Sequence, residues 1–236
     1  MNFLNSSGTR RGFLVNSSAL LGLAALSSPI NLLGCSPIEK KTTEVTATED
    51  LMREHGVLRR LLLIFDNLEG RLRQSRDFPP QVLTDAAGLI RRFIEDYHEK
   101  LEENHVFPRF EKAGKMVDLV KVLRRQHEAG RKVTAFLLSP AASALDPAAR
   151  QKVADYIHAF SRMYRPHAAR EDTVLFPALR GVVSPGEFNE MGDKFEDQEV
   201  ARFGPGGFNK IVGQVAGLEK VLGLENLSQF TPQLQP

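Results

Sequence analysis

The sequence predicts an all-α protein, an up-down-up-down antiparallel four-helix bundle with two additional C-terminal helices. Apolar residues recur at spacings of three and four along most of the 236-residue chain, which is the period of an amphipathic helix. Proline, glycine and capping residues divide this pattern into separate segments. We find no alternating run of the kind that predicts a β-strand.

The first helix is expected to begin at Thr46, which has capping-box spacing to Glu49. Its apolar residues form one stripe, namely Leu51, Leu58, Leu61, Leu62, Phe65 and Leu68. Pro79 and Pro80 end the following loop and begin a second helix, expected over about 81–104, because proline is favoured in the first turn.

Gly114 precedes a third helix over about 116–138, which ends before Pro140. Asp146 is a good N-cap and Pro147 a good first residue for a fourth helix, which we expect to reach about residue 173. Short links between four long helices favour an antiparallel bundle.

The C-terminal part contains a short fifth helix after Ser184-Pro185 and a sixth over about 208–222. We assign residues 48–180 to the bundle and 181–236 to a helical extension and tail. The acidic stretch 187–199 is interpreted as a solvated face of the fifth helix.

The first 35 residues are interpreted as a signal peptide. Residues 9–14 read T-R-R-G-F-L and resemble a twin-arginine export signal. The apolar stretch 13–26 is interrupted by Asn16, Ser17 and Ser18, and is shorter than the ~20 apolar residues of a spanning helix. We therefore expect export to the periplasm or cell envelope.

The segment Leu32-Leu33-Gly34-Cys35 resembles a lipobox. Two outcomes stay open: Cys35 becomes a lipidated first residue, or cleavage nearby leaves it unmodified or removes it. Contact with a membrane is expected only through such an anchor. Residues 36–47 are interpreted as a polar linker.

Charge and cysteine content limit the partners and the covalent links. Of 31 basic residues, Arg10 and Arg11 fall in the signal, which leaves 29 against 29 acidic residues. A chain near neutrality is not expected to bind nucleic acid. With Cys35 as its one cysteine, the chain has no internal disulfide, and a metal is the obvious further source of stability.

Two pairs of segments repeat along the chain. Residues 98–108 (HEKLEENHVFP) align without a gap with 167–177 (HAAREDTVLFP), at an offset of 69. Residues 54–59 (EHGVLR) align with 126–131 (QHEAGR), at an offset of 72. The chain is thus two helical hairpins of one plan, each with a lone histidine on its first helix and H-x-x-x-E on its second.

This spacing predicts a metal centre. Residues i and i+4 lie on one helix face, so two hairpins can direct four imidazoles and two carboxylates into one interior. Such a set suits two metals ~3.5–4 Å apart, with Glu102 and Glu171 bridging them. Mixed imidazole and carboxylate ligands favour iron or manganese, and zinc less distinctively. The predicted ligands are His55, His98, Glu102, His127, His167 and Glu171.

Each of these residues alone is a weak signal, because a lone histidine is usually a core or surface residue. The repeat in register changes this, since unpaired ionisable groups on two inward faces would be costly without a metal. The Phe107-Pro108 and Phe176-Pro177 pairs are expected to end the ligand helices and to pack as an aromatic lid near the site.

Several neighbouring residues keep two interpretations. Glu99 is an extra terminal ligand or a solvated residue, and His105 lies near the ligands or is exposed. His158 is expected at the surface. Tyr97 and Tyr164 donate hydrogen bonds to a bound oxygen species or only pack in the core, and Arg59 and Arg131 pair with carboxylates near the site or lie on the helix surface.

The pattern H…HxxxE…H…HxxxE over about 48–180 resembles the hemerythrin-like cation-binding domain. The resemblance implies a di-iron centre held by the six residues above. Oxygen-carrying hemerythrins have a further histidine where this chain has Arg131, and His-x4-Asp where it has His167-x3-Glu171. In these respects it is more similar to bacterial di-iron proteins linked to nitric-oxide stress and iron–sulfur repair, and to the iron-sensing version in animals. We expect no counterpart of the cysteine-bearing N-terminal domain of the repair proteins.

The resemblance implies a non-haem di-iron protein that binds O2, NO or peroxide in sensing, binding or protection. One alternative is a di-iron oxidoreductase that reduces NO, O2 or peroxide with electrons from a partner protein. A labile iron store or donor is a second alternative, and a structural zinc site a weaker one.

Overall fold

The computed structural model describes residues 45–143 and 145–233. In this part of the chain every regular element is helical, which confirms the all-α prediction. The predicted signal peptide, Cys35 and the linker up to residue 44 lie outside the described residues.

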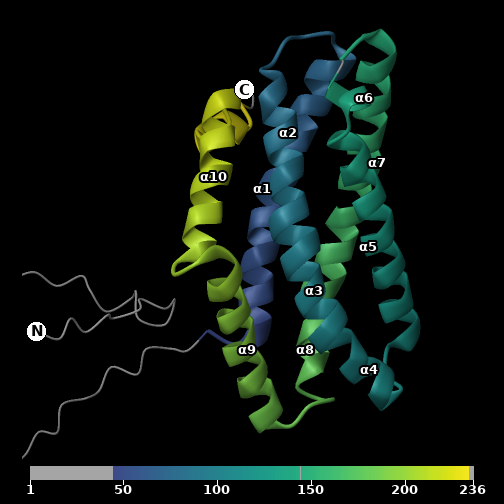
Figure 1. Cartoon of the computed structure of the whole chain (residues 1–236), viewed down its shortest axis with the longest axis vertical. Helices are drawn as coiled ribbons and strands as arrows, with labels where there is room; N and C mark the ends of the chain where they lie inside the picture. Colours follow the sequence, from purple (N-terminus) through teal and green to yellow (C-terminus); the bar gives the residue numbers. More distant parts are fainter. Residues whose placement is uncertain (1–44, 144, 234–236) are drawn as a thin grey trace, which may run out of the picture.

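Four long helical arms lie side by side (Figure 1). The first is α1 (Ala47–Arg73) and the third is α5 (Val117–Leu137). The second arm comprises α2 (Pro80–Leu89), η2 (Ile90–His98), α3 (Glu99–Leu101), η3 (Glu102–Val106) and α4 (Phe107–Ala113). After the short α6 (Pro140–Ser143), the fourth arm comprises α7 (Pro147–Arg170), η4 (Glu171–Leu175) and α8 (Phe176–Leu179). Successive arms run in opposite directions in Figure 1.

The expected start signals are present at three helices. The Thr46 hydroxyl accepts a hydrogen bond from the Glu49 amide, and the Glu49 carboxylate accepts one from the Thr46 amide, as in a capping box. Asp146 accepts from the Ala149 amide at 2.8 Å, with Pro147 in the first turn. Ser184 and Glu187 form a second capping box. These local bonds satisfy amides that have no partner within the helix.

The Phe-Pro pairs do not end the ligand helices, so that prediction is wrong. The second arm continues to Ala113 and the fourth to Leu179. Proline lacks an amide hydrogen, and its ring clashes with the carbonyl four residues earlier in a regular α-helix. A π-helical segment precedes each pair, at Glu102–Val106 and Glu171–Leu175, and this wider turn accommodates the proline.

The C-terminal helices α9 (Pro185–Phe203) and α10 (Gly207–Leu222) lie along the α1 side of the bundle (Figure 1). Arg60 of α1 donates to Glu219 of α10 at 2.7 Å, and Phe203 packs on Tyr97 with ring centroids 5.2 Å apart. At 19 residues α9 is not short. Its acidic stretch is not wholly solvated either, because Glu199 is buried.

None of the described helices combines the length and the apolar character needed to cross a membrane.

Candidate metal centre

The six predicted ligands lie together in the interior of the bundle. Each arm supplies at least one of them: His55 from α1, His98 and Glu102 from the second arm, His127 from α5, and His167 and Glu171 from the fourth arm. All six are buried, with 4% or less of each residue exposed. The hydrophobic stripes of the arms therefore enclose a cluster of ionisable groups.

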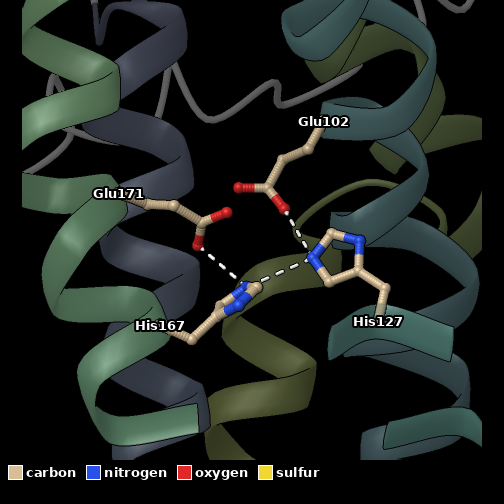
Figure 2. Close-up of side chains that lie close together, drawn as sticks. All are labelled: Glu102, His127, His167 and Glu171. Carbon is tan, nitrogen blue, oxygen red and sulfur yellow. Dashed lines mark hydrogen bonds and ion pairs between the residues drawn. The ribbon is translucent and has the colours of Figure 1, made fainter. Parts of the chain in front are cut away.

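The Nε2 atoms of all four histidines point toward the two glutamates. Glu171 Oε2 lies 3.4 Å from His55 Nε2 and 3.1 Å from His167 Nε2. Glu102 places Oε1 3.6 Å from His98 Nε2 and Oε2 3.5 Å from His127 Nε2. Figure 2 shows Glu102, His127, His167 and Glu171 converging in this way. Each glutamate thus faces one histidine from each hairpin, as bridging carboxylates require.

The histidines group into two positions. We call His55 and His98 the first metal position and His127 and His167 the second metal position, with Glu102 and Glu171 between them. In the second position the two Nε2 atoms are 3.2 Å apart. Potential ligand atoms of Glu102, His127, His167 and Glu171 lie within 4.8 Å of one another, as do those of His55, His98 and Glu102.

The outward Nδ1 atoms each face an oxygen of another side chain. His55 Nδ1 lies 2.7 Å from Asp172 and His127 Nδ1 lies 3.0 Å from Glu103. His98 Nδ1 lies 2.8 Å from Glu54, and His167 Nδ1 lies 2.8 Å from the Gln126 side-chain oxygen. When Nδ1–H donates to these acceptors, Nε2 keeps its lone pair for a metal.

The carboxylates at the centre fit a metal. None of the four oxygens of Glu102 and Glu171 accepts a hydrogen bond from any described residue, although all four are buried. A buried carboxylate without a partner is costly. Two cations between the carboxylates and the four Nε2 atoms would satisfy these groups.

Burial and the neighbouring charges shift the pKa values of three groups in the cluster. Burial alone would lower the pKa of His55, but the hydrogen bond to Asp172 and the negative charge of Glu171 outweigh burial and raise the pKa to about 9. Burial would raise the pKa of Glu171, but the charges of His167 and His55 beside it hold this pKa well below its usual range. Burial, together with the charge of Glu171, raises the pKa of Glu102 well above its usual range.

The predicted aromatic lid is present. Phe176 stacks on His55 with ring centroids 5.5 Å apart, and Phe107 stacks on His127 at 5.6 Å. Both phenylalanines are buried. They cover the equivalent histidine in each hairpin, and each directly follows a π-helical segment.

Glu99 is not solvated, which corrects that interpretation. It is buried and accepts hydrogen bonds from the Tyr164 hydroxyl at 2.6 Å and from Arg131 at 2.7 Å. It also lies 3.9 Å from His127 Nδ1. Glu99 therefore lies behind the second metal position rather than between the Nε2 atoms.

Both arginines of the repeat pair with carboxylates near the site. Arg59 donates to Asp172, and Arg131 to Glu103 as well as Glu99. His158 lies at the surface as expected, with 55% of its side chain exposed.

Two further residues lie away from the Nε2 cluster. His105 is partly buried against Phe195, with its Nε2 3.1 Å from Gln198 Nε2. Tyr97 is buried and its hydroxyl donates to the carbonyl of Phe195, at 3.5 Å.

The roles of the four residues that contact the Nδ1 atoms of the ligand histidines were not predicted from the sequence. Glu54 and Gln126 directly precede the lone histidines, and Glu103 and Asp172 directly follow the glutamates. The repeat contained the signal, because these residues occupy equivalent positions in the two hairpins. That they would contact the histidines was not evident from the sequence, because each histidine and the residue at its Nδ1 atom come from two different arms.

These features define a helical protein with a buried site for cations. The family model for the hemerythrin HHE cation binding domain matches residues 46–179, and in a second match residues 118–199. The first match covers more than half of the chain, and the protein belongs to this family.

Two mycobacterial proteins are similar to the chain over nearly its full length. They carry the descriptions uncharacterized protein Rv1995, from Mycobacterium tuberculosis, and uncharacterized protein Mb2018, from Mycobacterium bovis. Each is 48% identical over 235 residues, which cover 94% of this chain and 91% of the relative. No solved structure matches the chain.

Proposed function

We propose that the protein holds two iron ions at the first and second metal positions and binds O2, NO or peroxide there, in sensing, binding or protection. The observation that carries the proposal is the convergence of four Nε2 atoms on Glu102 and Glu171, with every Nδ1 facing an oxygen. Each metal would have two imidazoles and one oxygen from each of the two central carboxylates, and such mixed nitrogen and oxygen ligands suit non-haem iron.

The enclosure of the site supports a small ligand. All six ligands are buried and Phe107 and Phe176 lie against two of them. A diatomic molecule or peroxide fits such a space better than an organic substrate does. Bound iron would supply open coordination positions, while the chain orients the imidazoles, holds their Nδ1 protons and excludes bulk water.

Iron loading tests the proposal. The metal-free chain is loaded with Fe²⁺ without oxygen, the bound iron is counted, and absorption is followed as O2, NO or peroxide is added. We expect two irons per chain and a change in absorption with at least one ligand. The variants His55→Ala and His127→Ala should each lose iron, whereas His158→Ala, at the surface, should keep both.

The same experiment distinguishes the alternatives. A stable and reversible change in absorption supports binding, and repeated turnover of NO, O2 or peroxide with an added electron donor supports an oxidoreductase. Rapid loss of iron to a weak chelator supports a store or donor. Binding of zinc in preference to iron, without response to any of these molecules, contradicts the proposal.

The proposal places this activity outside the cytoplasm. It is supported by Arg10-Arg11 before an apolar stretch and by the lipobox-like sequence that ends at Cys35. Fractionation of cells that express the full chain tests it, with Arg10→Lys/Arg11→Lys as the variant that should accumulate inside. Equal export of that variant contradicts the twin-arginine route.

A further inference from the structure

The two metal positions differ in one of the four groups that contact Nδ1. His98 Nδ1 lies 2.8 Å from a carboxylate oxygen of Glu54, whereas His167 Nδ1 lies 2.8 Å from the amide oxygen of Gln126. Glu54 and Gln126 are equivalent in the repeat, since each directly precedes a lone histidine. The same hydrogen bond is therefore made to a charged acceptor in one half and to a neutral one in the other.

A charged acceptor strengthens the imidazole as a ligand. A carboxylate that accepts from Nδ1–H draws the proton toward itself and raises the electron density at Nε2. A neutral amide does so less. The other two histidines are matched, because His55 faces Asp172 and His127 faces Glu103, so they do not offset this difference.

Glu54 also belongs to a group of three buried acidic residues. Carboxylate oxygens of Asp50, Glu54 and Glu199 lie within 4.8 Å of one another, and all three residues are buried. At the offset of 72, the residue equivalent to Asp50 is Val122, which is exposed. Asp50 also lies 4.0 Å from Arg53, so the member of this group that bears on a ligand is Glu54, through its contact with His98.

Glu99 does not restore equality at the second position. It lies near His127 rather than His167, at 3.9 Å from Nδ1. Both of its oxygens already accept hydrogen bonds, from Tyr164 and from the positively charged Arg131. The negative charge of Glu99 is therefore offset mainly by Arg131 and adds little to the second metal position.

We propose that the two positions are unequal, and that Glu54 and Gln126 set the inequality. The first position, with His55 and His98, binds a divalent cation first and more tightly. The second, with His127 and His167, binds its cation more weakly and releases it first. This inference rests on the proposed function only in requiring that both positions take a metal.

Exchange of the two residues tests the inference. The metal-free full chain is titrated with Co²⁺ by calorimetry, with Co²⁺ as a stable substitute for Fe²⁺. We expect two separate binding steps in the wild-type protein. Partners of this kind contribute about ten- to a hundred-fold to metal affinity, so Glu54→Gln should weaken the tighter step by that factor and bring the two steps together.

The reciprocal variant is the matched control. Gln126→Glu should tighten the weaker step by a similar factor, and the double exchange should restore two separate steps. Since Gln126→Glu predicts a gain, a loss of folding cannot imitate it. Thermal unfolding of each metal-free variant identifies any variant that fails to fold. The other variants of the three then still show whether Glu54 and Gln126 set the inequality.

The outcomes separate the two proposals. Absence of Co²⁺ binding by the wild-type chain would contradict the metal centre itself. Two bound ions with affinities that none of the exchanges alters would overturn the inequality and leave the metal centre intact.

Discussion

The two hairpins are alike where they face the metal positions and unlike one turn further along the bundle. Each supplies two histidines, one glutamate, an acidic residue that contacts an Nδ1 atom of the other hairpin, and an arginine that pairs with the acidic residue of the other hairpin. One turn away the first hairpin has Glu95 and Glu99, where the second has Tyr164 and Ala168. The repeat is thus strict where the groups face the candidate metals.

The residues one turn away, where the two hairpins differ, have interactions of their own. Tyr164 and Arg131 from the second hairpin bind Glu99 from the first, and Gly130 leaves room for the Tyr164 hydroxyl. In the other half, Leu58 stands at the position equivalent to Gly130. The difference teaches that the neighbourhood of one metal position can be changed without changing the ligands.

Removal of a central glutamate should have the largest effect on metal binding, and it tests the likeness of the hairpins. Glu102→Ala and Glu171→Ala should each reduce bound metal from two ions to at most one, because each carboxylate faces both positions. A metal at a hundred times its Kd stabilises a protein by about 2.7 kcal/mol, and most of that gain should be lost. Metal analysis and thermal unfolding measure this, with the exposed Glu190→Ala as control. Two ions held with wild-type affinity by either variant would contradict a bridging role.

The two arginines should differ sharply in their contribution to stability. Arg131 has 23% of its side chain exposed and pairs with the buried Glu99, whereas Arg59 has 51% exposed and pairs with Asp172. Loss of one partner from a buried pair costs about 3–5 kcal/mol, and loss of an exposed pair less than about 1 kcal/mol. Urea unfolding of metal-free Arg131→Gln and Arg59→Gln should show this order. Equal losses of unfolding free energy would mean that the Arg131–Glu99 pair stabilises the protein no more than a surface pair does.

Glu95, which is equivalent to Tyr164 in the repeat, should make stability depend on pH. Burial raises the pKa of Glu95 to about 7, against 4.5 as its ordinary value, despite the opposing effects of the nearby Thr134 hydroxyl and of the charge of Arg91. Between these values the folded chain holds a proton that the unfolded chain has released. Stability from this group is therefore complete below about pH 4.5 and is lost as the pH rises through 7.

The variant Glu95→Gln should remove this dependence and stabilise the metal-free protein above pH 7, by at most about 3 kcal/mol. Unfolding free energies of the variant and the wild type at pH 5, 6, 7 and 8 give the difference. The neighbouring Asp96→Asn, which removes a partly exposed charge paired with Arg202, is the matched control. A difference that stays constant across this range would contradict the shift.

The smallest expected effect concerns the close approach of Gly130 and Tyr164. A methyl group at residue 130 would collide with the Tyr164 ring and hydroxyl, so Gly130→Ala should cost about 1–3 kcal/mol. Tyr164→Phe removes the hydroxyl, and the double variant should lose less than the sum of the two single losses. Strictly additive losses in urea unfolding would show that the two residues do not interact.

Local signals sufficed for much of the helical pattern. Thr46 with Glu49, Asp146 with Pro147, and Ser184 with Pro185 begin helices where predicted, because capping depends on residues within one turn. The ends of the ligand helices were predicted wrongly at Phe107-Pro108 and Phe176-Pro177. A π-helical segment there depends on packing and metal-site geometry as well as on proline.

By itself, the sequence determined the helices, the two-hairpin plan and the set of six residues that would share one interior, because spacing along a helix specifies which side chains lie on one face. The tertiary structure alone decided the partners of each Nδ1 atom, the burial of Glu99 and Glu199, and the contrast between Glu54 and Gln126. These contacts join different arms. They depend on how the helices are rotated and aligned against one another, which the period of a single helix does not report.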